Sequence, residues 1–80
     1  MQIKLYELRK KAGLKQEDLA KMLGISQNSY GHKERGDTDF KLSEMFKIAN
    51  FFNRKIGDIF FTNFNSFFNA RTKKIRNTLH

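Results

Sequence analysis

The sequence predicts an all-α protein built from five short helices. Five successive segments read as short helices, most of them with apolar residues at helical spacing, and each of the first four is followed by a residue that tolerates a left-handed turn. No stretch alternates apolar and polar residues as a half-buried strand would, and proline is absent. We expect one helical domain at residues 1–61, followed by a C-terminal extension at 62–80. The predicted helices span residues 2–12, 16–23, 27–35, 41–52 and 56–61.

The first predicted helix, 2–12, is amphipathic. Leu5, Leu8 and Ala12 share one face at positions i, i+3 and i+7, with lysines outside that face. Gly13 follows and is expected to end the helix in a left-handed conformation.

The second and third predicted helices differ in what they can bury. Residues 16–23 place Leu19, Ala20 and Leu23 on one face before Gly24 ends the segment. Residues 27–35 begin with the polar run Gln-Asn-Ser, contain Tyr30 as their main apolar anchor, and end at Gly36. A helix that buries so little within its own domain is expected to present its other face to a partner.

The last two predicted helices complete the core. Residues 41–52 carry the clearest apolar stripe, and Asn53 follows where a left-handed cap is needed. Residues 56–61 then close the core. The stripe of the fourth helix comprises Leu42, Met45, Phe46, Ala49 and Phe52, and the fifth helix contributes Ile56, Ile59 and Phe60.

The composition bounds the class of protein. Eighty residues suffice for one domain, and the absence of cysteine rules out a disulfide framework and a thiolate metal site. With two histidines, a zinc cluster is not expected, and we expect no cofactor. No apolar run approaches the roughly 18 residues of a membrane span, and Met1 leads directly into a helical pattern. These features predict a cytoplasmic protein without membrane contact.

The charge points to a polyanionic partner. Sixteen Lys and Arg against eight Asp and Glu give a net charge of +8 and a pI near 10.1. This balance favours nucleic acid first, and an acidic membrane surface or acidic protein second. A charge that only maintains solubility is the remaining interpretation. The polar third helix supports DNA, because the major groove is about 12 Å wide, admits one α-helix and presents adenine edges that amide side chains match.

The residues then show a resemblance to a known family. The segments LRKKAGLKQEDLAKMLGIS, ERG and FKIANFF…IGDIFF resemble the lambda-repressor-like helix-turn-helix family, which includes Cro, phage repressors and the XRE-type regulators. The resemblance covers about residues 3–61. It implies a five-helix bundle whose third helix, 27–35, reads double-stranded DNA.

The resemblance also implies roles for individual residues. Gln27 and Asn28 would contact bases, and Gln16 would bond a phosphate and brace Gln27. His32 is a third base-contact candidate, because it lies one turn beyond Asn28. Arg9 and Glu34 match the family's structural ion pair between the first and third helices. The residues expected at phosphates are Lys15, Gln16, Ser29, Lys33, Arg35 and Lys41.

Several residues depart from the family pattern. Lys15 and Lys41 stand where Ser, Thr or Asn usually caps a helix, and Thr38 or Asp39 could replace the second cap. We hypothesise that these lysines exchange helix stability for positive charge at phosphates. Three further residues depart from the pattern. The ammonium of Lys33 is expected to reach outward, and Phe40, which replaces a proline, is expected to pack as a staple. Gly31 either allows close approach to DNA or is merely tolerated.

The predicted function is a sequence-specific transcriptional regulator of the Cro or repressor type that binds as a homodimer, because one helix reads few base pairs. A restriction-modification controller protein is consistent with the same interpretation. The alternative is an antitoxin-like protein that binds a partner through residues 62–80 and regulates its own synthesis. That extension has four basic and no acidic residues, and its apolar side chains either share a sixth helix or fold back on the bundle: Phe64, Phe67, Phe68, Ile75 and Leu79. No nucleophile, base and orienting residue form a pattern that predicts an enzyme.

Overall fold

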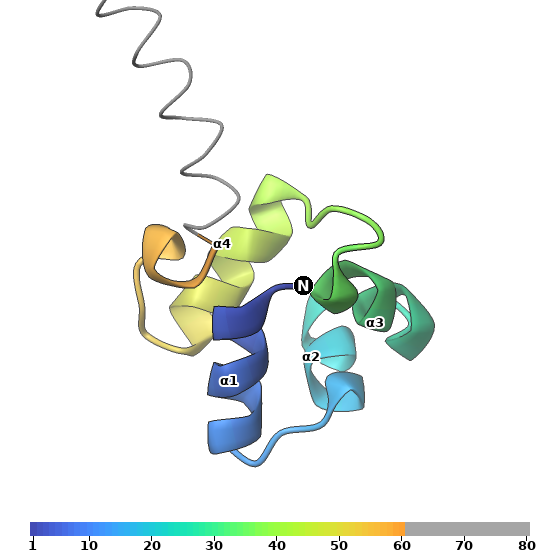
Figure 1. Ribbon diagram of the computed structural model, residues 1–80, viewed down its shortest axis with the longest axis horizontal. Helices are drawn as coiled ribbons and strands as arrows, with labels where there is room; N and C mark the ends of the chain where they lie inside the picture. The colour runs from blue at the N-terminus through green and yellow to red at the C-terminus, as the bar shows by residue number, and fades with distance from the viewer. Residues whose placement is uncertain (61–80) are drawn as a thin grey trace, which may run out of the picture.

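The computed structural model describes residues 1–60, and this part of the chain is helical without a strand. Four helices have defined bounds, and residues 56–60 form a further helical segment (Figure 1). The prediction of five short helices is therefore confirmed: the second and third have the predicted bounds, and the ends of the first and fourth differ by one residue. Residue 61, the extension 62–80 and the sixth helix considered there lie outside the described residues. The bounds are α1 Ile3–Lys11, α2 Gln16–Leu23, α3 Gln27–Arg35 and α4 Leu42–Phe51.

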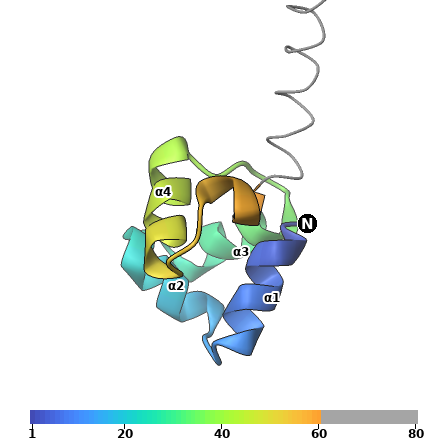
Figure 2. The ribbon, with the colours of Figure 1, turned by 90° about the vertical axis from the view of Figure 1, so that its left-hand side faces the viewer.

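The helices wrap around a shared core rather than forming layers. The helix α2 packs against both α3 and α4. Figures 1 and 2 show the segment 56–60 beside α4, so that the end of the described chain closes the bundle. The short α2 thus supports α3 from behind and leaves one side of α3 uncovered.

The turns between helices follow the expected chemistry. Gly24 ends α2 at φ 71°, and Gly36 ends α3 at φ 90°. Asn53, with φ 54°, is the non-glycine residue in the described chain that adopts a left-handed conformation. Gly13 has φ 72°, so the left-handed ends predicted after the first and fourth helices are both confirmed. Because these ends are tight, the following helix begins within a few residues and its direction is fixed.

The core joins all the helical segments. Leu5, Leu19, Tyr30 and Ile48 are at most 1% exposed, and each comes from a different helix. Ile59 and Phe60 are buried with them, as predicted for the last segment, and Ile56 packs against the same cluster. Each side chain of this size stabilises the fold by about 1.5–3 kcal/mol when it leaves water.

Phe40 links the third helix to the last segment. Its ring lies 5.8 Å from the ring of Tyr30 and 5.4 Å from that of Phe60, both in edge-to-face geometry. Each such pair adds about 0.5–1.5 kcal/mol to the burial of the rings. Phe40 is 5% exposed and therefore acts as a core residue in the connection before α4.

The predicted apolar stripe of α4 is partly wrong. Ala49 is buried and Met45 and Phe52 pack on the core, but Leu42 and Phe46 are 54% and 56% exposed. Ile48, which the stripe omitted, is fully buried. The stripe is wider than the surface that the bundle offers to α4, so its outer edge stays in solvent. Ala12 of the first predicted stripe is likewise exposed, since it follows the last turn of α1.

No helix within residues 1–60 is both long and apolar enough to cross a bilayer.

Candidate nucleic-acid interface

The helix α3 has well-formed ends. Ser26 precedes it in an extended conformation, and its Oγ accepts a hydrogen bond from the backbone N–H of Ser29 at 3.0 Å. Such a cap stabilises a helix by about 1 kcal/mol. Ser26 stands in the motif that carries the family resemblance, and its capping role could have been read from its place before the helix.

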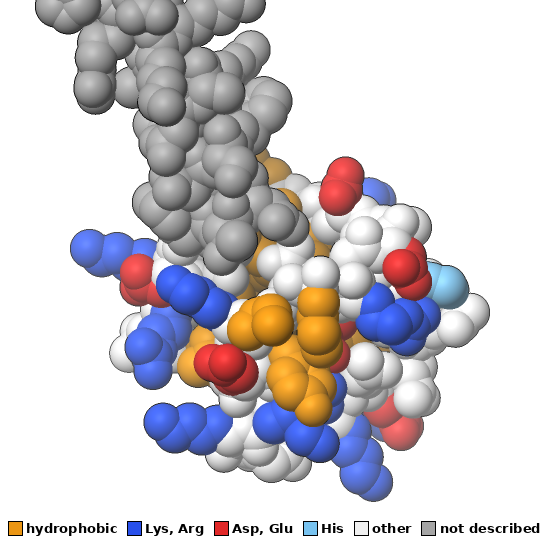
Figure 3. Space-filling view, viewed as in Figure 1, with side chains coloured by type: hydrophobic (Ala, Val, Ile, Leu, Met, Phe, Trp, Pro, Cys, Tyr) orange, Lys and Arg blue, Asp and Glu red, His pale blue; other side chains and the backbone are white. Residues whose placement is uncertain are grey.

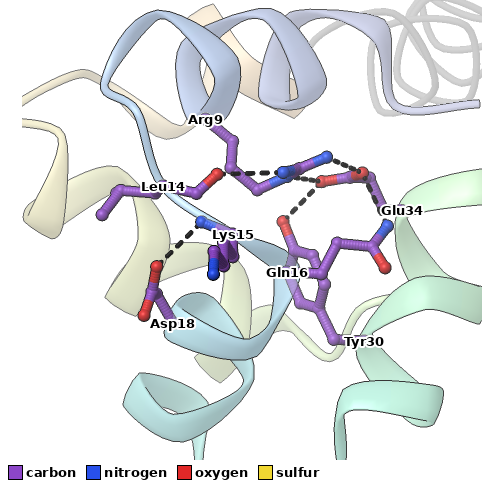
Figure 4. Close-up of polar contacts among 7 residues, drawn as sticks. All are labelled: Arg9, Leu14, Lys15, Gln16, Asp18, Tyr30 and Glu34. Carbon is purple, nitrogen blue, oxygen red and sulfur yellow. Dashed lines mark hydrogen bonds and ion pairs between the residues drawn. The ribbon is translucent and has the colours of Figure 1, made fainter.

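A buried polar network fixes the inner side of α3 (Figure 4). Glu34 is 1% exposed and accepts hydrogen bonds from Arg9 Nε at 2.8 Å and Arg9 Nη2 at 3.0 Å. It also accepts from the Tyr30 hydroxyl at 2.8 Å and from Gln16 Nε2 at 3.1 Å. Arg9 donates in addition to the carbonyl of Leu14 at 3.0 Å. The pair that the resemblance implies is thus in contact and joins α1 to α3, and the bond from Gln16 adds α2.

The network determines the charge states of its members. Burial opposes ionisation of Glu34, but the hydrogen bonds from Arg9, Gln16 and Tyr30 outweigh it and hold the pKa of this carboxyl below its usual value. The bond to Glu34 raises the pKa of Arg9. Burial, and then the bond to Glu34, raise the pKa of Tyr30 far above its usual value, so the phenol remains a donor. A charged, fully bonded Glu34 holds α3 rigidly against the bundle.

The outer side of α3 presents amide groups to solvent. Gln27 and Asn28 are exposed, and within the described chain neither side chain is hydrogen-bonded to another residue. They line an open hollow of about 310 Å³ together with Gln16, Gly31 and Arg35. Residues at i, i+1, i+4 and i+8 share one helix face, so this hollow runs along α3. The arrangement leaves amide donors and acceptors free for an external ligand.

The hydrogen-bond partner of Gln16 differs from the expected one. The prediction was that it braces Gln27, but its amide nitrogen donates to Glu34 instead. Its Oε1 faces the hollow, since it lies 3.3 Å from where a Cβ on Gly31 would stand. The buried carboxylate is the stronger acceptor, which explains the preference. Gln16 therefore connects the inner network to the outer face.

A charged cluster lies at the end of α3. Asp37 Oδ2 is 3.2 Å from His32 Nδ1 and accepts a hydrogen bond from Arg35 Nε, also at 3.2 Å. Arg35 Nη2 lies 3.3 Å from the same histidine nitrogen. The hydrogen bonds from His32 and then Arg35 lower the pKa of Asp37. On the face in Figure 3, histidine, acidic and basic side chains lie beside one another over α3.

Sequence reasoning did not assign a role to Asp37. Gly36 turns the chain back, and the backbone N–H of Asp37 bonds the carbonyl of His32 at 2.9 Å. An acidic residue directly after a left-handed glycine at a helix end was the available signal. His32 consequently faces this carboxylate at the edge of the α3 outer face and does not line the hollow.

The comparison with protein families decides what kind of unit this is. A helix-turn-helix family model matches residues 5–59. The chain belongs to the helix-turn-helix family of the Cro and XRE-type regulators. The two helices of the motif are α2 and α3, and the turn between them contains Gly24.

Three archaeal relatives of this helix-turn-helix protein align over 60 residues, or 75% of the chain. An uncharacterized HTH-type transcriptional regulator of Methanocaldococcus jannaschii is 48% identical, and the match covers 91% of it. Two uncharacterized HTH-type transcriptional regulators of Archaeoglobus fulgidus are 37% and 38% identical, with 86% and 84% of their lengths covered. No solved structure matches the chain.

In this helix-turn-helix protein, Lys33 does not reach outward as expected. Its ammonium donates to Glu44 Oε1 at 2.6 Å, and the two side chains are 14% and 8% exposed. Burial opposes the charge of Glu44, but bonds from Lys33 and the Lys41 backbone outweigh it and lower the pKa of Glu44. Because the ammonium is held between α3 and α4, we leave Lys33 out of the proposed phosphate contacts.

The helices α2 and α4 both begin after a lysine, and their first turns are bonded in the same way. A lysine side chain cannot accept a hydrogen bond, so Lys15 and Lys41 cannot cap α2 and α4 in the ordinary way. The reciprocal bond of a capping box does form at each start: Asp18 Oδ2 accepts from the Lys15 backbone N–H and Glu44 Oε1 accepts from the Lys41 backbone N–H, both at 2.8 Å. The expectation that Thr38 or Asp39 caps α4 is wrong, because no side chain caps the start of this helix. Both lysines are exposed beside helix N-termini.

Among residues 1–60, no three His, Asp or Glu side chains gather in a way that could hold a metal ion.

Proposed function

We propose that this helix-turn-helix protein is a transcriptional regulator that binds a specific sequence of double-stranded DNA by placing α3 in the major groove. One observation carries the proposal: Gln27 and Asn28 stand exposed on the outer side of a helix whose inner side is fixed by Glu34. The family and the names of the relatives support the same function.

The chemistry of the outer side fits base reading. An amide carries a donor and an acceptor side by side, which matches the N6 and N7 edge of adenine. Gln27 and Asn28 are the proposed base contacts, with His32 as a third at the edge. Since the buried network holds α3 in place before binding, little backbone entropy is lost when the complex forms.

Phosphate contacts would surround the recognition helix. Lys15 and Lys41 bring ammonium groups to the starts of α2 and α4, where backbone N–H groups also favour anions. Ser29 is exposed in the first turn of α3, and Gln16 offers its oxygen side to the hollow. These contacts would set the position of the protein on the duplex and supply much of its affinity.

Binding as a homodimer is part of the proposal. One recognition helix contacts only a few base pairs, which is too little to select a site in a genome. Two copies of α3 would read half-sites about 10 bp apart, and the operator would be a palindrome. The proposal predicts a two-protomer complex on such a site.

Selection of bound duplexes from a random pool at about 150 mM salt tests the proposed function. We expect an enriched palindrome, and we expect the double variant Gln27→Ala, Asn28→Ala to lose the enrichment while remaining folded. Lys21→Ala is the matched control, because Lys21 lies on the exposed side of α2 and its side chain is 76% exposed. A pool that shows no enriched sequence overturns the proposal.

The salt dependence of binding gives a second test. If each protomer neutralises about four phosphates, a dimer has a slope of about −7 in a plot of log affinity against log salt. Analytical ultracentrifugation of the complex with the selected duplex measures its stoichiometry. A single protomer on the full site contradicts the homodimer, and an affinity that does not change between about 50 and 200 mM salt contradicts nucleic acid as the partner.

A further inference from the structure

We propose that Arg35 is a base-reading residue that selects guanine, that Gly31 provides the space for its side chain, and that Asp37 is the positioning residue that orients it. This inference rests on the proposed function and deepens it. It replaces the phosphate contact expected of Arg35 by a contact that determines the sequence bound.

The Arg35 side chain lies along the outer side of α3. Its guanidinium does not extend beyond the end of α3 but turns back over the preceding turn, as side chains in helices do. A Cβ on Gly31 would lie 3.1 Å from Arg35 Nη1 and 3.9 Å from its Cζ. The guanidinium therefore occupies the place that a side chain at residue 31 would fill, at the end of the hollow that Gln27 and Asn28 also line.

This placement suits the spacing of base pairs. Gly31 is four residues beyond Gln27, so the guanidinium lies about 6 Å further along the helix axis. Neighbouring base pairs are separated by about 3.4 Å. Arg35 would thus face a base pair one or two steps from the one that Gln27 contacts, within the same half-site. Arginine paired with guanine O6 and N7 is the commonest specific contact in the major groove.

Asp37 distinguishes a base contact from a phosphate contact. Its carboxylate bonds Arg35 Nε at 3.2 Å, and His32 Nδ1 lies 3.3 Å from Nη2 on the same edge of the guanidinium. A carboxylate beside a phosphate contact would repel the DNA backbone and offset the charge of the arginine. Beside an uncharged base edge, the same carboxylate causes less electrostatic repulsion, and it restrains the long arginine side chain. Nη1, which lies over Gly31, remains directed into the hollow.

The test compares base preferences of the full chain and its variants. We would determine the selected DNA sequence with wild-type protein and then measure binding to duplexes in which each guanine is replaced in turn. We expect Arg35→Lys to lose preference for one guanine per half-site by about 5- to 150-fold while non-specific affinity changes little. Arg54→Lys is the matched control, because Arg54 is an exposed arginine outside the α3 cluster.

The variant Asp37→Asn gives the decisive result. Removal of a negative charge near DNA should raise the affinity for all duplexes if Asp37 acts only electrostatically. If it positions Arg35, Asp37→Asn lowers the preference for the same guanine that Arg35→Lys affects. Asp39→Asn, an exposed acid in the same connection, should raise overall affinity without changing preference.

The outcomes separate this inference from the proposed function. A wild-type protein that enriches no sequence overturns both. An enriched sequence whose guanine preferences are unchanged in Arg35→Lys overturns the inference alone and returns Arg35 to a phosphate contact. If Arg35→Lys loses the guanine preference but Asp37→Asn keeps it, Asp37 does not position Arg35.

Discussion

The variant Glu34→Gln tests the network that holds the recognition helix. Glu34 accepts four hydrogen bonds from Arg9, Gln16 and Tyr30, two at each carboxylate oxygen. A glutamine has the same shape but only one acceptor oxygen, and its NH₂ group would face two donors. The substitution also leaves Arg9, whose side chain is 8% exposed, without its counter-ion.

The expected loss is large for a domain of this size. Removing one partner of a buried ion pair costs about 3–5 kcal/mol. A small domain has a free energy of unfolding of roughly 5–15 kcal/mol, so much of its stability would be lost. At about 4–8 °C per kcal/mol, the melting temperature should fall by at least about 12 °C.

Urea and thermal unfolding followed by circular dichroism measure this loss. Glu17→Gln is the matched control: Glu17 and Lys21 form an exposed pair at 3.4 Å, with side chains 52% and 76% exposed. Such surface pairs contribute little, about 0–1 kcal/mol. A loss below about 1 kcal/mol in Glu34→Gln, or losses of equal size in the two variants, would refute the view that a buried, charged Glu34 fixes α3.

The contacts and helix ends also determine how the protein should respond to pH and to substitutions elsewhere. Since the folded-state pKa of Glu34 is lowered, its stabilisation is present above the unfolded value of 4.5 and is lost as pH falls through the folded-state value; acid unfolding of wild type should therefore be steeper with pH than that of Glu34→Gln. Gly31→Ala should raise the unfolding free energy by up to about 1 kcal/mol, because the nearest atoms are ends of flexible side chains, yet weaken the guanine preference in binding assays. Asn53→Ala should cost about 1 kcal/mol in urea unfolding, whereas Asn53→Gly should not, because φ is 54°. Lys15→Ser and Lys41→Ser should each raise stability by about 1 kcal/mol and reduce DNA affinity and its salt slope; higher melting temperatures with unchanged DNA binding would contradict the exchange of stability for charge.

The fold could be predicted because its signals are local. Gly13, Gly24, Gly36 and Asn53 end helices through their own backbone preferences, and all four adopt the left-handed conformation. The periodic apolar residues of the first three helices also reach the core at Leu5, Leu19 and Tyr30 where expected, except at Ala12. In α4 the apolar pattern was broader than the buried face, so Leu42 and Phe46 were assigned wrongly.

The candidate site was predictable in part. The exposed positions of Gln27 and Asn28 agree with their expected roles as outward-facing residues, which remain proposals as contacts. The partner of a long polar side chain was not predictable, because several acceptors lie within its reach. Gln16 thus bonds Glu34 rather than Gln27, and Lys33 bonds Glu44 rather than reaching solvent.

The sequence by itself determined the helices, their ends, the excess of positive charge and the polar character of the third helix, because each depends on residues close together in the chain. Only the tertiary structure decided which charges remain free on the surface. The family resemblance implied the pair of Arg9 and Glu34, but nothing in the sequence indicated that Glu44 would bind Lys33 of another helix, 11 residues away along the chain. Such pairings depend on distances across the folded bundle, and a buried carboxylate takes whichever donor that geometry brings within hydrogen-bond range.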